Sequence, residues 1–180
     1  DIRGLFIPEH NQMWLKADYS QQEPRILTHW ACLVDQPGAY EVKQAYHNLD
    51  LDFHQQTADM AGVERRLAKT IGLGVMYGMG YNKMAKELDI EPSEAKIMLA
   101  DFRNKVPFMQ GMLEAVMNRA SSKGVIRTLL GRKCRFDLWE PKQWGVHKAL
   151  PINQAKVEYG DAIKRAGTYK ALNRLIQGSA

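Results

Sequence analysis

The sequence predicts a mostly α-helical fold with small β elements, an α+β domain of moderate size. Helical patterns dominate, because apolar residues recur at helical spacing and Pro24 and Pro92 stand where the first turn of a helix accepts proline. Strand patterns are confined to a short run at residues 13–17 and to two stretches on either side of Gly131. The 180 residues are enough to bury a core.

The first half of the chain is expected to be one short strand followed by helices. The apolar-rich run from Met13 to Ala17 predicts a buried strand that ends at Asp18. Pro24 then begins a helix that extends to about Val34, and the next four residues, 35–38, predict a turn. Further helices are expected at residues 40–48, 52–60, from about 63, and at 81–88.

The second half is expected to be helical around one hairpin. Residues 91–93 predict the start of a helix that extends to Val106, and Pro107 separates it from another that extends to Ser121. The stretches 124–130 and 133–138 predict a hairpin around Gly131. We expect an irregular connection at 139–151 and a largely helical stretch at 152–176, with an interruption near Gly167.

Composition and charge exclude several classes of protein. A net charge of +5 and a pI near 9.2 make a polyanion a plausible partner. Cys32 and Cys134 lie far apart without a CxxC pattern, and the histidines form no HExxH motif, so neither a disulfide framework nor a zinc site is indicated. The sequence shows no signal peptide and no apolar run long enough for a bilayer, which predicts a cytosolic setting with no membrane partner.

A stripe of four residues is the most informative feature. Arg65, Lys69, Leu73 and Tyr77 recur at every fourth position, which places them along one slowly turning face of a helix. The two cations stand in the half where the helix dipole is already positive, an arrangement that suits a triphosphate. Nearby glycines, which are costly in a helix, suit close approach by a flat group or another backbone. The alternative is an amphipathic surface helix with solvated basic residues.

Asp18 is a candidate metal ligand, because carboxylates at strand ends often hold Mg²⁺. The alternative is a turn or cap residue ahead of the Pro24 helix, and spacing alone favours it. Glu23 likewise suits the start of that helix through the dipole.

Five segments, in order, resemble signatures of the family A DNA polymerases, the bacterial DNA polymerase I group with its phage relatives. In this sequence, DYSQQEPRILTHWA resembles the family's palm signature, and RRLAKTIGLGVMYG resembles its fingers signature, RxxxKxxx(F/Y/L)xxxYG. DFHQQTA resembles the DxHxxTA segment of the family. GVIRTLLGRKCRF resembles the family's hairpin motif G(Y/F)VxTLxGRRR, and ALNRLIQGSA resembles its NxxxQG(T/S)A segment. Leucine at position 73, where many relatives have an aromatic residue, favours a phage-type origin and a host-cytoplasm setting.

The resemblance implies roles around the reacting groups. Asp18 would be one of two metal-binding catalytic aspartates, and Tyr19 would offer its carbonyl to one of two Mg²⁺ ions. Glu23 would be the steric gate against a ribose 2′-hydroxyl and would pair with Tyr77. The activity implied is template-directed transfer of a nucleotide from a dNTP to a primer 3′-hydroxyl.

The resemblance also implies ligands for nucleotide and DNA. His54, Arg65 and Lys69 would hold the triphosphate, with Lys69 a possible general acid, and Leu73 and Tyr77 would lie beside sugar and base. The DNA contacts would come from Lys170, Asn173, Gln177 and, in the hairpin, Arg132. A merely solvated hairpin is an equally good interpretation of Arg132 and its basic neighbours Arg127, Lys133 and Arg135.

These roles imply a division into partial palm at 1–35, fingers at 36–165 with a nucleotide helix at about 63–79, and a helix returning toward the palm at 166–180. We expect a piece of a larger polymerase with the remaining palm and thumb elsewhere. The family's second catalytic aspartate lies downstream of QG(T/S)A, so this chain alone is expected to be inactive. Two alternatives stay open: a fragment of a single-subunit RNA polymerase, against which Glu23 argues, and a non-catalytic helical DNA-binding module.

Overall fold

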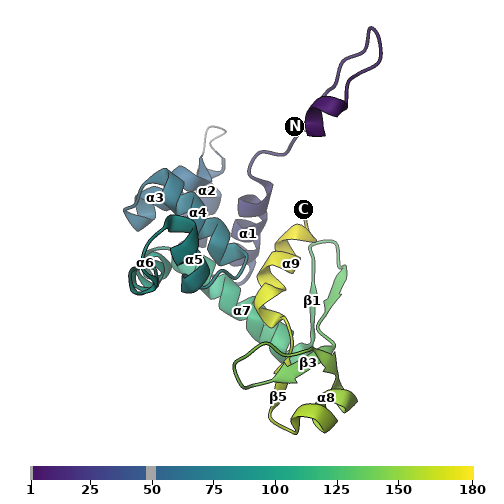
Figure 1. The fold of residues 1–180 in the computed structure, drawn as a ribbon. Coiled ribbons are helices and arrows are strands. Elements are labelled where there is room, and N and C mark those ends of the chain that lie inside the picture. Colours follow the sequence, from purple (N-terminus) through teal and green to yellow (C-terminus); the bar gives the residue numbers. More distant parts are fainter. Residues whose placement is uncertain (1, 48–51) are drawn as a thin grey trace.

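The computed structural model describes residues 2–47 and 52–180, and helices dominate it (Figure 1). The expected mostly helical fold with small β elements is confirmed. The elements before the first strand are η1 (Ile2–Leu5), α1 (Gln22–Leu33), α2 (Ala39–Ala45), α3 (Phe53–Ala61), α4 (Arg65–Met76), α5 (Tyr81–Leu88), α6 (Pro92–Lys105) and α7 (Pro107–Lys123). The rest are β1 (Val125–Arg127), β2 (Lys133–Arg135), β3 (Leu138–Pro141), β4 (Leu150–Pro151), α8 (Ile152–Tyr159), β5 (Ile163–Arg165), η2 (Thr168–Lys170) and α9 (Ala171–Gln177).

Helix α7 is the central element of the fold. It contacts α1, α4, α6, α9 and β1, and in Figure 1 it runs from the side of α5 and α6 toward β3. Phe108 and Met112 of α7 are almost fully buried, as are Phe102 of α6 and Leu172 of α9. Burying such a side chain contributes roughly 1.5–3 kcal/mol, so this shared core fixes α4 and α9 relative to each other.

A chain of aromatic and polar contacts joins α1, α2 and the start of α3. The guanidinium of Arg25 lies 4.5 Å from the ring centre of Tyr46, which stacks on Phe53 with 6.3 Å between ring centres. The backbone N–H of Phe53 donates to Oε1 of Gln21 at 2.8 Å. The first turn of α3 is therefore held beside the residues that precede α1.

Two small antiparallel sheets follow α7. The expected hairpin around Gly131 is confirmed, since β1 pairs with β2 and Ile126 lies opposite Cys134. The second sheet has the strand order β4-β3-β5, with Trp139 opposite both Leu150 and Arg165. None of the helices in the described stretches combines the length and apolar character needed to cross a bilayer.

The expected strand at residues 13–17 is wrong. These residues adopt no strand and are exposed, with Met13 at 94% and Leu15 at 92% exposure. The segment extends away from the helices in Figure 1, and within residues 2–47 and 52–180 it pairs with no other strand. A lone strand leaves its backbone groups unpaired, so the apolar pattern alone does not produce one.

The expectation for residues 139–176 is wrong in part. The connection expected to be irregular contains most of β3 and all of β4, and β5 interrupts the stretch expected to be helical. These strands have two to four residues, too few to show the alternation by which a strand is identified. The interruption expected near Gly167 is present, since Gly167 precedes η2.

Candidate functional site

The stripe on α4 forms an exposed face above a buried one. Helix α4 buries Ala68, Ile71, Gly72 and Val75, so the residues of the stripe face outward. Arg65, Lys69 and Tyr77 are exposed, whereas Leu73 is half-buried. Successive members of the stripe are about 6 Å apart along the helix axis. The helix thus presents cations near its start and an aromatic ring at its end.

An ion pair anchors the cationic end of the stripe to α3. Arg65 Nε donates to Asp52 Oδ2 at 2.7 Å, and Arg65 Nη2 lies 2.6 Å from the same oxygen. Asp52 is also the N-cap of α3, because its Oδ1 accepts the backbone N–H of His54 and Gln55. Burial raises the pKa of Asp52, but the hydrogen bonds from Arg65 and the backbone outweigh it, and the pKa of this carboxyl lies below its usual value.

His54 lies in the same electrostatic environment. Burial lowers the pKa of the imidazole; the carboxylate of Asp52 opposes this, while the charges of Lys69 and Arg65 lower the pKa further. The pKa of His54 therefore lies below its ordinary value, and the neutral form predominates at neutral pH. The three residues expected to hold a triphosphate thus act on one another, with two cations beside a neutral imidazole.

The other end of the stripe meets α1 and α9. Gln177 Nε2 donates to Glu23 Oε1 at 3.3 Å and to Tyr77 Oη at 3.3 Å. These three residues come from three elements and from sequence positions up to 154 apart. The expected pairing of Glu23 with Tyr77 therefore takes the form of a bridge through the amide of Gln177.

A Schellman motif ends α4 and shapes the adjoining pocket. The N–H of Met79 bonds the carbonyl of Gly74 at 2.7 Å, and that of Gly78 bonds the carbonyl of Val75 at 3.0 Å. Gly78 has a φ of 71°, and a β-carbon there would lie 2.7 Å from the backbone oxygen of Tyr169. The side chain of Met79 occupies the space that a β-carbon on Gly74 would need. Both glycines thus accommodate neighbouring parts of the chain itself.

A pocket of about 410 Å³ opens beside this helix end. Leu73 and Tyr77 of the stripe line it together with Gly74, Gly78 and Tyr169. Lys83 and Glu87, which also line it, form an ion pair at 3.7 Å. The stripe therefore leads from a cationic end to a pocket that Leu73 and Tyr77 help to line.

The other expected site residues lie on three further parts of the surface, one of which shares Gln177 with the bridge described above. Asp18 and Tyr19 are exposed in the extended segment before α1. Lys170, Asn173 and Gln177 follow helical spacing, so they share one face of α9 and the turn before it. Arg132 is exposed in the turn between β1 and β2. The structure brings Glu23, Tyr77 and Gln177 together at the C-terminal end of α4. At the other end, the backbone of His54 and the side chain of Arg65 both bond Asp52, and Lys69 lies one turn further along α4.

Two residues that shape these groups have no role in the expected site, although Asp52 begins the DFHQQTA segment. Asp52 fixes both Arg65 and the first turn of α3, and Tyr169 closes the pocket against Gly78. The position of Asp52, two residues ahead of His54 and just before a helical pattern, is that of an N-cap and could have drawn attention to it. The contact of Tyr169 is tertiary and has no local pattern in the sequence.

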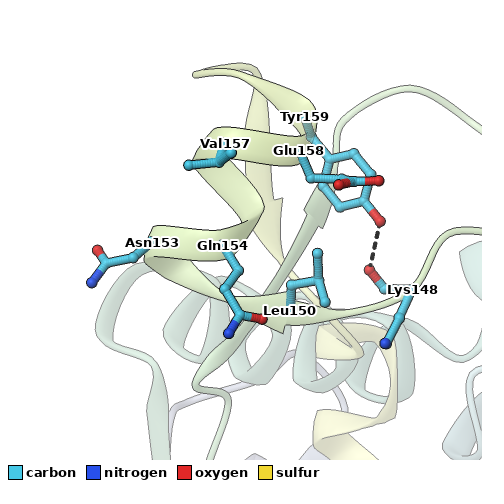
Figure 2. A pocket seen from close by; sticks show the side chains of 7 residues that line it. All are labelled: Lys148, Leu150, Asn153, Gln154, Val157, Glu158 and Tyr159. Carbon is cyan, nitrogen blue, oxygen red and sulfur yellow. Dashed lines mark hydrogen bonds between the residues drawn. The ribbon is translucent and has the colours of Figure 1, made fainter.

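A second, larger pocket of about 590 Å³ lies beside α8 (Figure 2). Leu150 and Val157 supply apolar surface, and Tyr159 Oη donates to the carbonyl of Lys148 at 3.0 Å. None of the expected site residues lines it.

Asp18 and Tyr19 offer the kind of donor that Mg²⁺ prefers, carboxylate and carbonyl oxygen. In the part of the chain that the structure describes, no group of three or more His, Cys, Asp or Glu side chains is gathered for a metal. By donor chemistry these two residues fit a Mg²⁺ ion.

Comparisons with known proteins identify the family of the chain. The family model described as "DNA polymerase family A" matches residues 1–180. A DNA-directed DNA polymerase of Pseudomonas phage M6 is 34% identical over 220 residues, covering 99% of this chain and 30% of that protein. A thermostable DNA polymerase I of Thermus filiformis is 32% identical over 188 residues, covering 99% of this chain and 20% of that protein.

A solved structure is similar as well. The POL domain of Pol1 from M. smegmatis, in complex with DNA primer-template and dNTP, superposes with a TM-score of 0.64 and 27% identity, covering 90% of this chain and 26% of that one. The chain thus spans less than a third of the length of these relatives. By the match of the family model to its whole length, the chain belongs to DNA polymerase family A.

Proposed function

We propose that this chain is the nucleotide-gripping part of a template-directed DNA polymerase, with partial palm at residues 1–35, fingers at 36–165 and a helix returning toward the palm at 166–180. The observation that carries the proposal is the bridge from Gln177 to both Glu23 and Tyr77. It joins the expected gate, the end of the nucleotide helix and the expected DNA-reading helix at one point. Relatives named as DNA polymerases support the same activity.

On this proposal, the N-terminal end of α4 would bind the triphosphate of a dNTP, and the C-terminal end would bind its sugar and base. Arg65 and Lys69 would neutralise the triphosphate, since phosphoryl transfer depends mainly on positioning and charge. Neutral His54 can donate one ring N–H to a phosphate oxygen without adding repulsion toward the two cations. Lys69 would also protonate the leaving pyrophosphate, the role of general acid.

At the other end, Leu73 and Tyr77 would contact sugar and base beside the 410 Å³ pocket. Glu23, held by Gln177, would crowd the 2′ position of the sugar and so exclude ribonucleotides. Asn173 and Gln177 would contact minor-groove acceptors, which are similar in every base pair and so report pairing geometry rather than sequence. Lys170 and Arg132 would contact phosphates, with a strength that falls as salt rises.

Asp18 and the carbonyl of Tyr19 would hold Mg²⁺ on the palm side. Two such ions would stabilise charge on the attacking and leaving oxygens. Asp18 is one carboxylate in an exposed segment, so we propose that the 180-residue chain does not polymerise alone. Template-directed extension by the purified chain that disappears in Asp18→Ala would refute this.

Competition between dNTP and rNTP tests the proposal in the complete polymerase. The wild type is expected to select dNTP, and Glu23→Ala should reduce that selection because it removes the carboxylate at the 2′ position. A preference for rNTP in the wild type would instead identify a single-subunit RNA polymerase. DNA affinity that is the same with and without matched dNTP and Mg²⁺ would identify a non-catalytic DNA-binding module.

A further inference from the structure

Asp52 connects the two helices that carry the expected triphosphate ligands. The two carboxylate oxygens of Asp52 bind different helices. Oδ1 accepts the backbone N–H groups of His54 at 2.9 Å and Gln55 at 3.2 Å. Oδ2 accepts Arg65 Nε at 2.7 Å and lies 2.6 Å from Nη2. One carboxylate therefore caps α3 and holds the first side chain of the α4 stripe.

The geometry of this pair leaves part of the guanidinium available. Arginine has five N–H donors in a rigid fork, and Asp52 takes the edge formed by Nε and Nη2. Within residues 2–47 and 52–180, the opposite edge, formed by Nη1 and the second N–H of Nη2, keeps the two parallel donors that bind phosphate in a bidentate manner. Side-on pairing thus directs the unused edge of Arg65 without occupying it.

The pair is poorly suited to a purely structural role. The side chains of Arg65 and Asp52 remain 49% and 37% exposed, and exposed ion pairs add little to folding stability. A flexible arginine loses rotamer freedom when it binds a ligand, and an arginine that is already held loses less. The benefit of the pair is therefore expected in ligand binding.

We propose that Asp52 is a positioning residue for the incoming nucleotide, which holds Arg65 and the first turn of α3 so that the triphosphate meets oriented donors. The inference rests on the function proposed above. It extends that function to a residue that would not itself contact the substrate. A negative charge near a polyanion is unfavourable by itself, so the orientation of Arg65 must outweigh that repulsion.

The opposing effects give a decisive test with Asp52→Asn. The asparagine oxygen can still cap α3, but its amide offers no acceptor to Arg65. If Asp52 acts only through charge, its removal should tighten binding of a triphosphate. If it orients Arg65, binding should weaken about 3- to 10-fold, the loss expected when one long side chain must be ordered on binding.

The measurement is a calorimetric titration of the 180-residue chain with Mg²⁺-dATP and, separately, with inorganic tripolyphosphate, which has no sugar or base. Asp59→Asn is the matched control, because it removes the same charge from α3, the helix that Asp52 caps, at a carboxylate that accepts a hydrogen bond from Gln55. Weakening of both ligands in Asp52→Asn, but not in Asp59→Asn, is the expected result. Unchanged or tighter binding in Asp52→Asn overturns the inference.

A double-mutant cycle separates this inference from the proposed function. Arg65→Ala should weaken both ligands, and Asp52→Asn should then have no further weakening effect, because its target is gone. Weakening in Arg65→Ala without weakening in Asp52→Asn would remove the role of Asp52 and leave the triphosphate site in place. Absence of binding in the wild type, or full binding in Arg65→Ala, would overturn the proposed triphosphate site itself. Circular dichroism of each variant shows whether α3 and α4 remain folded.

Discussion

Alanine at Gly78 is expected to destabilise the chain, whereas alanine at Gly72 is expected to stabilise it. Gly78 has a φ of 71°, a conformation that costs a residue with a β-carbon about 1–2 kcal/mol. The new carbon would also lie 2.7 Å from the backbone oxygen of Tyr169, which has no side-chain freedom to move away. Gly72 is inside α4, and its nearest neighbours, Met109 Cε and Phe102 Cζ, would be at 3.7 and 3.9 Å, an ordinary contact distance.

The matched pair gives opposite shifts in the unfolding temperature. For a chain of this size about 1 kcal/mol corresponds to about 2–4 °C. Gly78→Ala should therefore unfold about 2–8 °C lower from its backbone conformation alone, and Gly72→Ala up to about 4 °C higher from helix propensity of up to 1 kcal/mol. Thermal unfolding followed by far-UV circular dichroism measures both. An unchanged Gly78→Ala, or a Gly72→Ala less stable than Gly78→Ala, would contradict the structure of this helix end.

Three further predictions concern the two ends of the site. In the complete polymerase, Leu73→Tyr should improve incorporation of dideoxynucleotides, because a phenolic hydroxyl beside the sugar can replace the contact that the missing 3′-hydroxyl leaves unmade. Unchanged discrimination between dideoxynucleotides and deoxynucleotides in a chain-termination assay would count against the placement of Leu73 beside the sugar. The pKa of His54 lies below its ordinary value of about 6.5, so the unfolded chain binds the proton more readily than the folded chain. The free energy of unfolding should therefore decrease as pH drops from about 6.5 through the folded pKa. Denaturant unfolding between pH 7 and pH 5 should show a smaller decrease in the free energy of unfolding for His54→Gln than for the wild type. If Lys170 contacts a DNA phosphate, Lys170→Ala should reduce the slope of log K for DNA binding against log salt concentration by about 0.9. Lys164, which pairs with Glu140, is the control, and Lys164→Ala should leave the slope unchanged. Equal slopes in both variants would remove Lys170 from the DNA contacts.

Local patterns predicted the helices well. Helix α5 has the predicted bounds, Tyr81–Leu88, and α6 and α7 begin at Pro92 and Pro107. Proline stabilises the first turn of a helix by its fixed φ and its missing donor, so these starts depend on residues adjacent in sequence. Helix α4 is shorter than predicted because Gly78, in the left-handed region, belongs to the cap rather than to the helix.

Tertiary pairing explains what could not be predicted. Strand β3 is defined by partners at Leu150 and Arg165, and no pattern within its own four residues specifies them. The same holds in the site, where periodicity placed Arg65 and Tyr77 on one face but not their contacts. Asp52 is 13 positions from Arg65, and Gln177 is 100 positions from Tyr77. Those contacts depend on how the core around α7 sets the helices against one another.

The bridge at Gln177 links the proposed gate, Glu23, to the proposed DNA-contacting face of α9, and it uses the N–H groups of a single amide. A glutamine amide nitrogen has two N–H groups, and in this structure Nε2 donates to Glu23 and to Tyr77. A minor-groove acceptor of DNA would have to bind one of these same two N–H groups. With both engaged, Gln177 retains only its Oε1 acceptor for DNA, and minor-groove contact through Nε2 requires at least one of these bonds to open. On the proposed function, the grip of Gln177 on paired DNA and its hold on Glu23 and Tyr77 are therefore competing states of one side chain.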